Sequence, residues 1–324
     1  MAARILITEP IVDSVIENLQ KDYTVDVGRR GQFNSVDALC EVIDRYDALM
    51  PMLSNPITAE VIEAGENLRI IANHAVGYNN IDIEAAKNAN IHVANTPGVL
   101  TEACADLTWA LLLSVARHLG PAEDFLRDDK FDGWDPLGFL GTELYGQTLG
   151  ILGMGRIGTA VARRAKGFGL NIIYHNRTEV DAETEQRLNA TYVPSPKKLA
   201  ARSDILSLHC PLTDETHHLV DAEFIEQMPG HAILINTARG PVIDEQALAE
   251  ALHEKRLAGA GLDVFEDEPK VHPSLLDAPN CVLTPHIGSA TLQTRRAIGQ
   301  KAADAIKGIL NDRDPSTIPN LLTA

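Results

Sequence analysis

The chain has 324 residues, more than one compact core usually accommodates, so we expect two domains. Its composition, 45% hydrophobic and 23% charged, is typical of a globular protein and excludes global disorder. With 28 Lys and Arg against 45 Asp and Glu, the formal charge of −17 makes nucleic acid and anionic membranes poor candidate partners.

The four cysteines are spread over the chain and form no CxxC pair, which argues against a disulfide framework and against a metal site. The N-terminal run MAARILITEP has no apolar signal core, and the longest apolar run, WALLLSVA, is too short to span a bilayer. We therefore expect a cytoplasmic protein without a bound metal.

From Arg4 to about Pro97, short runs rich in β-branched residues alternate with amphipathic runs. The strand-like runs are RILIT, YTVDV, ALMPM, LRIIAN and IHVAN, and the helix-like runs include IVDSVIENLQ and VDALCEVIDR. Strands interleaved with helices are typical of a parallel sheet built by right-handed crossovers and covered on both faces. This part of the chain therefore predicts a doubly wound α/β domain.

The segment 101–119, TEACADLTWALLLSVARHL, is apolar around most of its circumference. It predicts a helix that is buried in a core or lies at a subunit interface. The segment 131–146, FDGWDPLGFLGTELYG, is rich in Gly, Pro and aromatic residues and predicts a loop.

A second alternating series follows, which predicts a second doubly wound sheet. Its strand candidates are TLGILG, NIIYH, DILSLH, AILINT, AGAGLDV and NCVLTP. The last predicted helix, from Thr291 to about Leu310, begins after that sheet is complete. If this helix packs back on the first domain, that domain is discontinuous in sequence.

The run ILGMGRIG places Gly153, Gly155 and Gly158 in GxGxxG spacing after a strand and before a helix. In this motif the first glycine permits a tight turn, the second lets the backbone approach a pyrophosphate, and the third lets helix and strand pack closely. The phosphates then lie at a helix N-terminus, whose free N–H groups point at them. We interpret the run as a Rossmann dinucleotide site; the alternative is a glycine-rich turn of another α/β protein, such as a methyltransferase.

The next strand ends where a ribose 2′-hydroxyl would lie, eighteen to twenty residues after Gly158, at Asn176, Arg177 and Thr178. NAD sites usually carry Asp or Glu here, because a carboxylate accepts hydrogen bonds from both ribose hydroxyl groups and repels a 2′-phosphate. An arginine between an amide and a hydroxyl instead favours NADP(H) over NAD(H). Two alternatives remain: Arg177 is a solvated residue at a strand end, or Glu179 turns inward and takes the carboxylate role.

Three segments that follow strand-like runs carry groups suited to hydride chemistry: INTARGPVID, GLDVFEDEP and TPHIGSAT. Strand C-termini in a doubly wound sheet meet at the cofactor crevice, so these segments are expected to contribute to one site through Arg239, Asp263, Glu268 and His286. Reduction of a 2-oxo acid needs a cation for the carboxylate and carbonyl, which suits Arg239, and a proton donor, which suits His286. Glu268 would fix the imidazole tautomer and stabilise the imidazolium. Taken singly, the histidine could belong to an ordinary turn, and the arginine could cap a loop.

With HAVGYNNIDIEAA and NTPGVLTEACADLTWALLLSVARH, these motifs resemble the D-isomer-specific 2-hydroxyacid dehydrogenases, and most closely the glyoxylate/hydroxypyruvate reductases among them. The resemblance covers about Ile5 to Ile318. It implies a flavodoxin-like substrate domain formed by residues 1–98 and 288–324, with a Rossmann nucleotide domain, residues 99–287, inserted in it.

The resemblance assigns the catalytic roles to Arg239, Glu268 and His286. It implies that the backbone amides of Val76 and Gly77 bind the substrate carboxylate together with Arg239, while Asn79 and Asn80 shape their loop. The expected cofactor contacts, among which Asp263 meets the nicotinamide carboxamide, are Gly153, Gly155, Arg156, Ile157, Gly158, Asn176, Arg177, Thr178, Pro211, Thr237, Asp263 and Gly288. A homodimer through the nucleotide domain is also implied, with WDPLGF, residues 134–139, as the segment that would reach the partner's active site.

The sequence departs from the family pattern at two positions. Cys104 stands where relatives commonly carry a threonine near the cofactor phosphates, and Gly138 stands where such reductases often have a bulky residue. Phosphite dehydrogenases resemble the chain in fold and in a GW-P loop, but Val76 replaces their lysine, which counts against an inorganic dianion as substrate.

We therefore expect an enzyme that reduces glyoxylate or hydroxypyruvate-type 2-oxo acids to D-2-hydroxy acids, with NADPH preferred and NADH as a second cofactor. Two alternatives stay open. One is an NADH-preferring dehydrogenase of a bulkier 2-hydroxy acid, and the other is a dinucleotide-sensing interaction protein on the scaffold that transcriptional corepressors share.

Overall fold

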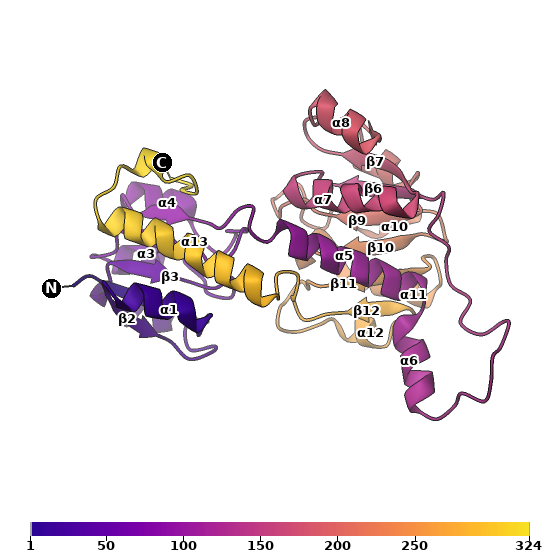
Figure 1. The fold of residues 1–324 in the computed structure, drawn as a ribbon, viewed down its shortest axis with the longest axis horizontal. Helices are drawn as coiled ribbons and strands as arrows, with labels where there is room; N and C mark the ends of the chain where they lie inside the picture. Colours follow the sequence, from indigo (N-terminus) through magenta and orange to yellow (C-terminus); the bar gives the residue numbers. More distant parts are fainter. Residues whose placement is uncertain (1, 324) are drawn as a thin grey trace. The chain divides into compact units, whose positions relative to one another are not determined.

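The computed structural model describes residues 2–323 and divides into two compact units (Figure 1). The first unit combines the chain up to Leu100 with the chain from Ser289 onward, and the second is Thr101–Gly288. The boundaries expected from the sequence, after residues 98 and 287, lie two residues and one residue from these.

A five-stranded parallel sheet forms the centre of the first unit, in the order β2-β1-β3-β4-β5. Its strands are β1 (Arg4–Ile7), β2 (Thr24–Val27), β3 (Ala48–Met50), β4 (Ile70–Ala72) and β5 (His92–Ala94). All four strand pairs are parallel. This strand order is flavodoxin-like, which confirms the predicted fold class.

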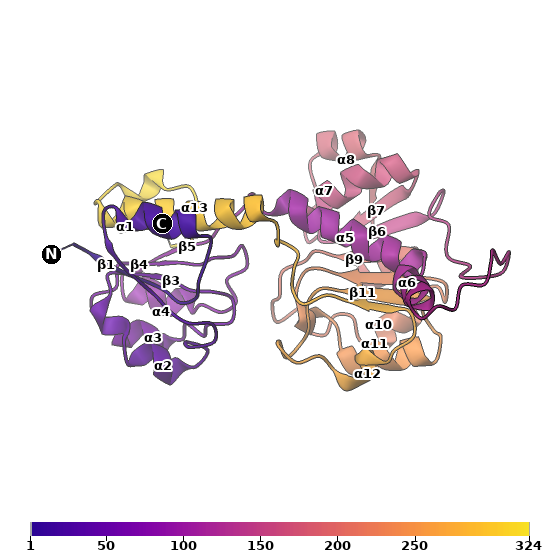
Figure 2. The same cartoon turned by 60° about the horizontal axis from the view of Figure 1, so that its bottom comes forward.

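Helices cover both faces of this sheet (Figure 2). They are α1 (Asp13–Gln20), α2 (Val36–Cys40), α3 (Ala59–Ala64), α4 (Ile83–Asn88) and α13 (Leu292–Leu310), with 3-10 turns η1 (Ile43–Arg45) and η4 (Pro315–Thr317). Side chains alternate along β1, so Ile5 and Ile7 pack under α1 and α13 while Leu6 packs on the side of α2, α3 and α4. The last predicted helix therefore belongs to the first unit.

A seven-stranded parallel sheet forms the centre of the second unit, in the order β12-β11-β10-β9-β6-β7-β8. Its strands are β6 (Thr148–Leu152), β7 (Asn171–His175), β8 (Ala190–Tyr192), β9 (Ile205–Leu208), β10 (Ile233–Asn236), β11 (Gly259–Leu262) and β12 (Cys281–Leu283). Read from β8, six of these strands follow the Rossmann order, and β12 extends the sheet by one. The predicted Rossmann fold is confirmed.

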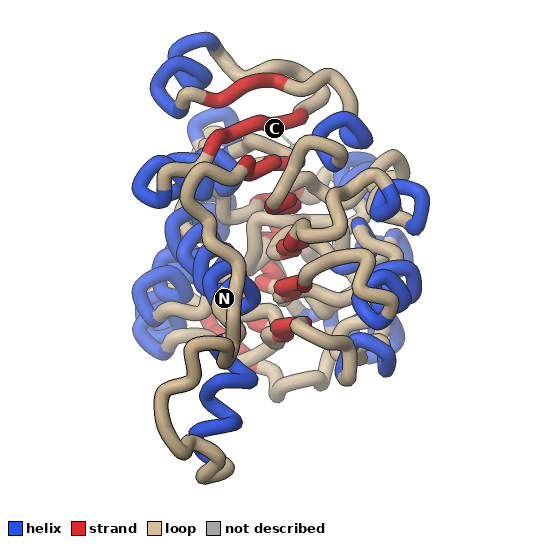
Figure 3. The backbone as a smooth tube through the Cα atoms, turned by 90° about the vertical axis from the view of Figure 1, so that its right-hand side faces the viewer, coloured by secondary structure: helices blue, strands red, loops and turns tan. Residues whose placement is uncertain are grey.

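Helices again lie on both faces of the sheet (Figures 2 and 3). The first face holds α5 (Thr101–Ala116), α7 (Arg156–Ala165) and α8 (Ala182–Leu188), with the 3-10 turn η2 (Lys166–Phe168). The second face holds α9 (Pro196–Ala200), α10 (Ala222–Glu226), η3 (Gly240–Val242), α11 (Glu245–His253) and α12 (Pro273–Leu276). Because both faces are covered, the strands are apolar on both sides, as buried parallel strands are.

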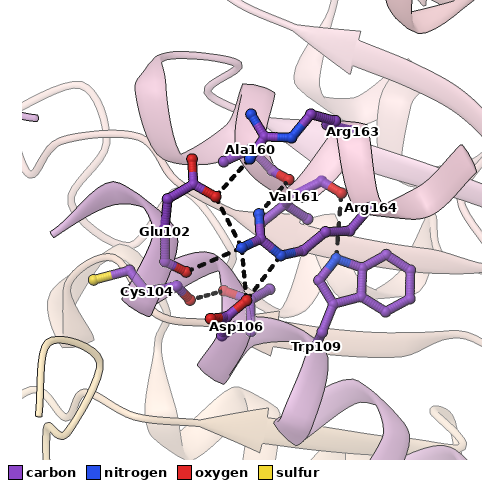
Figure 4. Close-up of polar contacts among 9 residues, drawn as sticks. Glu102, Cys104, Asp106, Trp109, Ala160, Val161, Arg163 and Arg164 are labelled. Carbon is purple, nitrogen blue, oxygen red and sulfur yellow. Dashed lines mark hydrogen bonds and ion pairs between the residues drawn. The ribbon is translucent and has the colours of Figure 1, made fainter. Parts of the chain in front are cut away.

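Polar contacts fasten α5 to α7 (Figure 4). The Arg164 guanidinium donates hydrogen bonds to Asp106 Oδ1 at 2.6 Å and to the Glu102 carboxylate at 2.9 Å. The Trp109 indole donates to the Val161 carbonyl at 3.2 Å. Exposed ion pairs are individually weak, but this group acts together with the apolar contacts of a buried helix. The helix after the glycine loop is thus held against the N-terminal half of α5.

The segment 119–146, which we call the apolar arm, comprises α6 (Leu119–Arg127) and the loop that extends from the second unit after it (Figure 1). Its exposed large apolar side chains are Leu119, Leu126, Phe131, Trp134, Leu137, Phe139, Leu140 and Tyr145. Trp134 is 85% exposed and Leu137 is 75% exposed. No helix within residues 2–323 is both long and apolar enough to cross a membrane.

Candidate active site

Six strands of the second unit end in register at the carboxyl edge of the sheet. The backbone pairing aligns in one row Leu283, Leu262, Asn236, Leu208, Leu152 and His175. The candidate residues Arg239, Glu268 and His286 each follow their strand by six residues or fewer. Ligands of open α/β sheets bind along this edge. The structure therefore brings the predicted segments together despite their distance in sequence.

The glycine loop between β6 and α7 has the geometry of a pyrophosphate cradle. Gly153 has a φ of +97°, and a Cβ there would lie 2.5 Å from the backbone nitrogen of Cys210. A Cβ at Gly158 would lie 2.5 Å from the Gly153 carbonyl oxygen, whereas at Gly155 it would meet nothing within 4 Å. No side chain of the described residues caps α7, so its first-turn amides, at Arg156 and Ile157, face outward unblocked. The loop fits a dinucleotide.

Asn176, directly after β7, connects the strand end to the glycine loop. Its side-chain oxygen accepts a hydrogen bond from the Met154 amide at 2.6 Å, and its carbonyl accepts one from the Tyr192 hydroxyl at 3.2 Å. Arg177 and Thr178 follow and are exposed. Glu215 lies near Arg177: hydrogen bonds from Thr213 chiefly lower the pKa of Glu215, and the arginine charge adds to this effect. The end of β7 therefore carries the exposed Arg177, and the nearby Glu179 is exposed as well.

Glu268 and His286 form a hydrogen-bonded dyad. His286 Nδ1 lies 2.8 Å from Glu268 Oε2, and Glu268 Oε1 accepts from the Phe265 amide at 3.1 Å. Burial alone would raise the pKa of Glu268, but the hydrogen bond and charge of His286 outweigh it and hold that pKa below its usual value. The carboxylate is thus ionised at neutral pH and leaves Nε2 as the outward-facing nitrogen of the imidazole.

Arg239 lies within electrostatic reach of this dyad. Burial lowers the pKa of Arg239, and the charge of Glu268 acts in the opposite direction. An arginine remains protonated under such opposing effects. Its Nη1 donates to the Ala238 carbonyl at 2.7 Å, so the guanidinium is oriented from its own backbone. A cation, a carboxylate and an imidazole therefore occupy one end of the sheet.

Asp263 organises the turn that carries His286. One carboxylate oxygen accepts from the Thr284 hydroxyl and the Ile287 amide, both at 2.7 Å, and the other accepts from the Gly288 amide at 2.8 Å. The His286 amide donates to the Asp263 carbonyl at 2.9 Å, and His286 has a φ of +52°. Burial raises the pKa of Asp263 in spite of these hydrogen bonds. The aspartate expected to contact a nicotinamide thus also fixes the histidine's backbone.

The remaining predicted cofactor residues lie along the same edge. The Thr237 hydroxyl is 2.9 Å from the Thr108 hydroxyl of α5, and Thr108 donates to the Cys104 carbonyl at 2.8 Å. A Cβ at Gly288 would lie 3.3 Å from the Cys104 sulfur. Pro211 is exposed just after β9. A thiol therefore lines the place where relatives were expected to carry a hydroxyl.

In the first unit, Val76 and Gly77 present two unused amides. The Val76 carbonyl accepts from the Asn95 side chain and the Gly77 carbonyl from the Asn73 side chain, both at 2.7 Å. Asn80 donates to the carbonyls of Met52 and Asn55 at 3.2 Å, which holds the loop as expected. Within the described residues, the amide groups of Val76 and Gly77 donate to no acceptor. Two adjacent outward amides can bind an anion.

Four asparagines fix loops that carry candidate residues, Asn73 and Asn95 in the first unit and Asn176 and Asn236 in the second, and sequence reasoning singled out only Asn176. Asn236 donates to the Arg239 carbonyl at 2.9 Å and accepts from the Ala238 amide at 2.9 Å, so it shapes the arginine turn as Asn73 and Asn95 shape the anion loop. The sequence did contain a signal for the other three. Asn73, Asn95 and Asn236 each stand at the end of an apolar strand, in IIAN, HVAN and ILIN. A short amide there can bond the backbone of the loop that follows.

A glycine cradle at a helix N-terminus, with a cation, a carboxylate and an imidazole at the same sheet edge, defines the class of nicotinamide dinucleotide-dependent dehydrogenases. Residues 109–288 match the family described as D-isomer specific 2-hydroxyacid dehydrogenase, NAD binding domain. The chain belongs to this family and is an NAD(P)-dependent oxidoreductase of 2-oxo and 2-hydroxy acids.

Full-length relatives agree with this assignment. The glyoxylate reductase of Thermococcus onnurineus is 45% identical over 324 residues, 99% of this chain and 96% of that protein. The structure of a glyoxylate reductase from Paecilomyes thermophila is 33% identical with a TM-score of 0.88, and the match covers 99% of this chain and 98% of that one. An NADPH-dependent glyoxylate/hydroxypyruvate reductase from Sinorhizobium meliloti, solved with NADP and malonate, is 36% identical with a TM-score of 0.85, covering 95% and 93%. The predicted family and enzyme class are confirmed.

Gly155→Ser tests whether the glycine loop binds the dinucleotide, because this substitution should weaken cofactor binding without weakening the fold. Gly155 is the N-cap of α7 with a φ of −81°, and serine is a favourable N-cap, so we expect the thermal midpoint to be unchanged or higher. Its hydroxyl would occupy the cradle and the first-turn amides, so dinucleotide affinity should fall by about tenfold or more in fluorescence titration. Gly167→Ser is the matched control, because Gly167 is equally open but lies beyond α7. Equal affinities in all three proteins would remove the pyrophosphate from this loop.

Proposed function

We propose that the protein is an NADPH-preferring reductase of glyoxylate and hydroxypyruvate-type 2-oxo acids, in which His286 is the proton donor and no metal takes part. The observation that carries this proposal is the Glu268–His286 hydrogen bond of 2.8 Å, with the half-buried Arg239 within electrostatic reach of Glu268. Full-length relatives named glyoxylate reductase support the substrate class.

Each of the three side chains has one task. A bound nicotinamide dinucleotide would supply a hydride to the carbonyl carbon. Arg239 would hold the substrate carboxylate and polarise the carbonyl, since a guanidinium offers two parallel donors. His286 would transfer the proton from Nε2 to the carbonyl oxygen as negative charge develops there. Glu268, bonded to Nδ1, stabilises the imidazolium before transfer and keeps the neutral ring in one tautomer afterwards.

We also propose that the amides of Val76 and Gly77 bind the substrate carboxylate. Support comes from their lack of acceptors within the described residues and from the side chains of Asn73 and Asn95, which occupy the two carbonyls. Because the carbonyls are already bonded, the peptide planes are fixed with their N–H groups outward. This arrangement favours an anion without adding a further charge.

His286→Ala tests the proton donor. We expect kcat with glyoxylate to fall by about 10²-fold or more, the usual contribution of a positioned general acid. His231→Ala is the control, because His231 is an exposed histidine paired with Asp204 before β10, at the amino edge of the sheet. Unchanged turnover in His286→Ala would take the histidine out of the mechanism. If the unmodified protein binds NADPH but turns over no 2-oxo acid, the dinucleotide-sensor alternative replaces the enzyme.

The preference for NADPH rests on the end of β7. Asn176 is neutral and bonded to the glycine loop, and the exposed Arg177 is free of any short ion pair among the described side chains. An arginine here can pair with a 2′-phosphate in two parallel hydrogen bonds. The NADPH dependence of the Sinorhizobium meliloti relative agrees with this choice. Glu215 lies near Arg177, so a 2′-phosphate would compete with the Glu215 carboxylate for the guanidinium.

Arg177→Ala tests this preference. We expect the ratio of kcat/KM for NADPH to that for NADH to fall by about tenfold or more, the value of a hydrogen bond to a charged group. Arg202→Ala is the control, since it removes the same charge just before β9, at the opposite edge of the sheet. A native preference for NADH that survives Arg177→Ala would transfer the ribose contact to Glu179 and contradict the proposal.

We propose that the protein is a homodimer in which a second copy covers the apolar arm. Support comes from its eight exposed large apolar side chains, because large exposed apolar surfaces mark sites of protein association.

We also propose a cytoplasmic location. The scattered cysteines support it, and cell fractionation would test it.

Leu137→Ser tests the dimer, because a polar side chain at the centre of an apolar interface weakens association. Sedimentation velocity should give a dimer for the native protein and a larger monomer fraction for this variant at micromolar concentration. Leu276→Ser, which changes a 66% exposed leucine outside the arm, should remain dimeric. A monomeric native protein would refute the assembly.

A further inference from the structure

Glu268 lies on the loop Phe265–His272. Two carboxylates, those of Glu245 and Glu266, form hydrogen bonds that hold the start of this loop. Glu245, the first residue of α11, is buried, and its Oε1 accepts from the Glu266 amide at 2.8 Å. Glu266 Oε1 in turn accepts from the Glu245 amide at 2.8 Å. The two residues thus exchange carboxylate–amide hydrogen bonds across the gap between the loop and α11.

The same side chain also holds the far end of the loop. Glu245 Oε2 accepts from the His272 amide at 3.3 Å, so one carboxylate spans the loop on both sides of Glu268. Burial raises the pKa of Glu245, although the amide hydrogen bonds from Glu266 and His272 act in the opposite direction. A buried carboxylate is costly unless its oxygens are bonded, which makes this arrangement specific to the loop conformation.

A glycine contact fixes the other side of the loop. A Cβ at Gly240, the residue after Arg239, would lie 1.9 Å from the Phe265 carbonyl carbon and 2.4 Å from the Glu266 nitrogen. The arginine turn therefore lies directly against the start of the Glu268 loop. Glu266 Oε1 is also 3.1 Å from His218 Nε2, and the His218 amide donates to the Pro241 carbonyl at 2.8 Å. These contacts lock the positions of Arg239 and Glu268 to one another.

We propose that Glu245 and Glu266 are positioning residues of the reaction, whose reciprocal hydrogen bonds hold Glu268 against His286. The inference rests on the proposed function for its catalytic meaning, but the positioning itself is a property of the protein alone. We call this Glu245–Glu266 pair the clamp. When its hydrogen bonds are removed, the Glu268 loop is free to move, the Glu268 carboxylate separates from His286 Nδ1, and the imidazolium loses the charge that stabilises it.

The charged and titratable groups around the clamp are few. Glu245 faces Glu266, His272 and Cys281, and burial together with the Glu245 charge raises the pKa of the Cys281 thiol to about 12. Glu266 faces Glu245 and His218. Glu268 faces His286 and Arg239, and the His286 charge also reaches Asp263. Neither clamp carboxylate contacts His286, so their influence on it passes through Glu268.

The test is Glu245→Ala, compared with Glu250→Ala as control. Glu250 is an exposed acid on the same helix, bonded only to the Gln246 side chain among its side-chain contacts. The first readout is ¹³C NMR titration of the Glu268 carboxyl without substrate or cofactor, assigned with Glu268→Gln. We expect this carboxyl to titrate about one pH unit higher in Glu245→Ala, because it loses the adjacent imidazolium, and to be unchanged in the control.

The second readout is the pH profile of kcat/KM with glyoxylate. Its alkaline limb should move to lower pH by about one unit in Glu245→Ala, since an imidazolium without a carboxylate loses its proton sooner. If this variant does not fold, Glu245→Gln decides: its amide oxygen can accept from Glu266, but its NH₂ cannot accept from His272, so a smaller shift of the same sign is expected. An unchanged Glu268 titration in a folded variant overturns the proposal. Absence of turnover in the native protein would refute the proposed function, while the NMR titration would still test the clamp.

Discussion

The structure depends on one constraint: a carboxylate taken out of water must have its oxygens bonded, and each bond fixes a piece of backbone. Asp263 meets this constraint with donors from residues 284–288, and so determines where His286 stands. The Glu268 carboxylate is more exposed, and its two oxygens are bonded to an amide of its own loop and to the imidazole. Hydrogen-bonded carboxylates thus hold the backbone segments that carry the candidate residues at the carboxyl edge of the second sheet.

Neutral asparagine side chains also fix loop backbone by hydrogen bonds, at positions where a carboxylate would repel an anionic ligand. Asn73 and Asn95 fix the loop of Val76 and Gly77, and an acid in their place would repel a substrate carboxylate. Asn176 ties β7 to the glycine loop through the Met154 amide, beside the position where a phosphate is proposed to lie. In each unit, asparagines at strand ends thus fix loop backbone by hydrogen bonds without adding a negative charge.

Much of this arrangement could be predicted from the sequence, because it depends on local spacing. Alternating strands and helices predict parallel sheets, GxGxxG predicts the cradle, and three motifs after strands predict Arg239, Glu268 and His286 at one edge. The strand order and the register row could not be predicted, since they are set by contacts between segments far apart in the chain. The Glu245–Glu266 pair was missed for the same reason: both residues look like ordinary acids at a helix start and in a turn, and only the tertiary fold buries Glu245 and brings the two together.

The position of α13 in the first unit affects how the chain can fold as it is synthesised. The second unit is complete once residue 288 has emerged, whereas the first unit must wait for residues up to about 310. Until then one face of its sheet, with Ile5, Ile7, Ala72 and Ala94, has α1 but lacks α13, the longer of the two helices that cover it. A nascent chain therefore carries an open apolar surface throughout translation of the entire dinucleotide unit, which is the kind of surface that ribosome-associated chaperones bind.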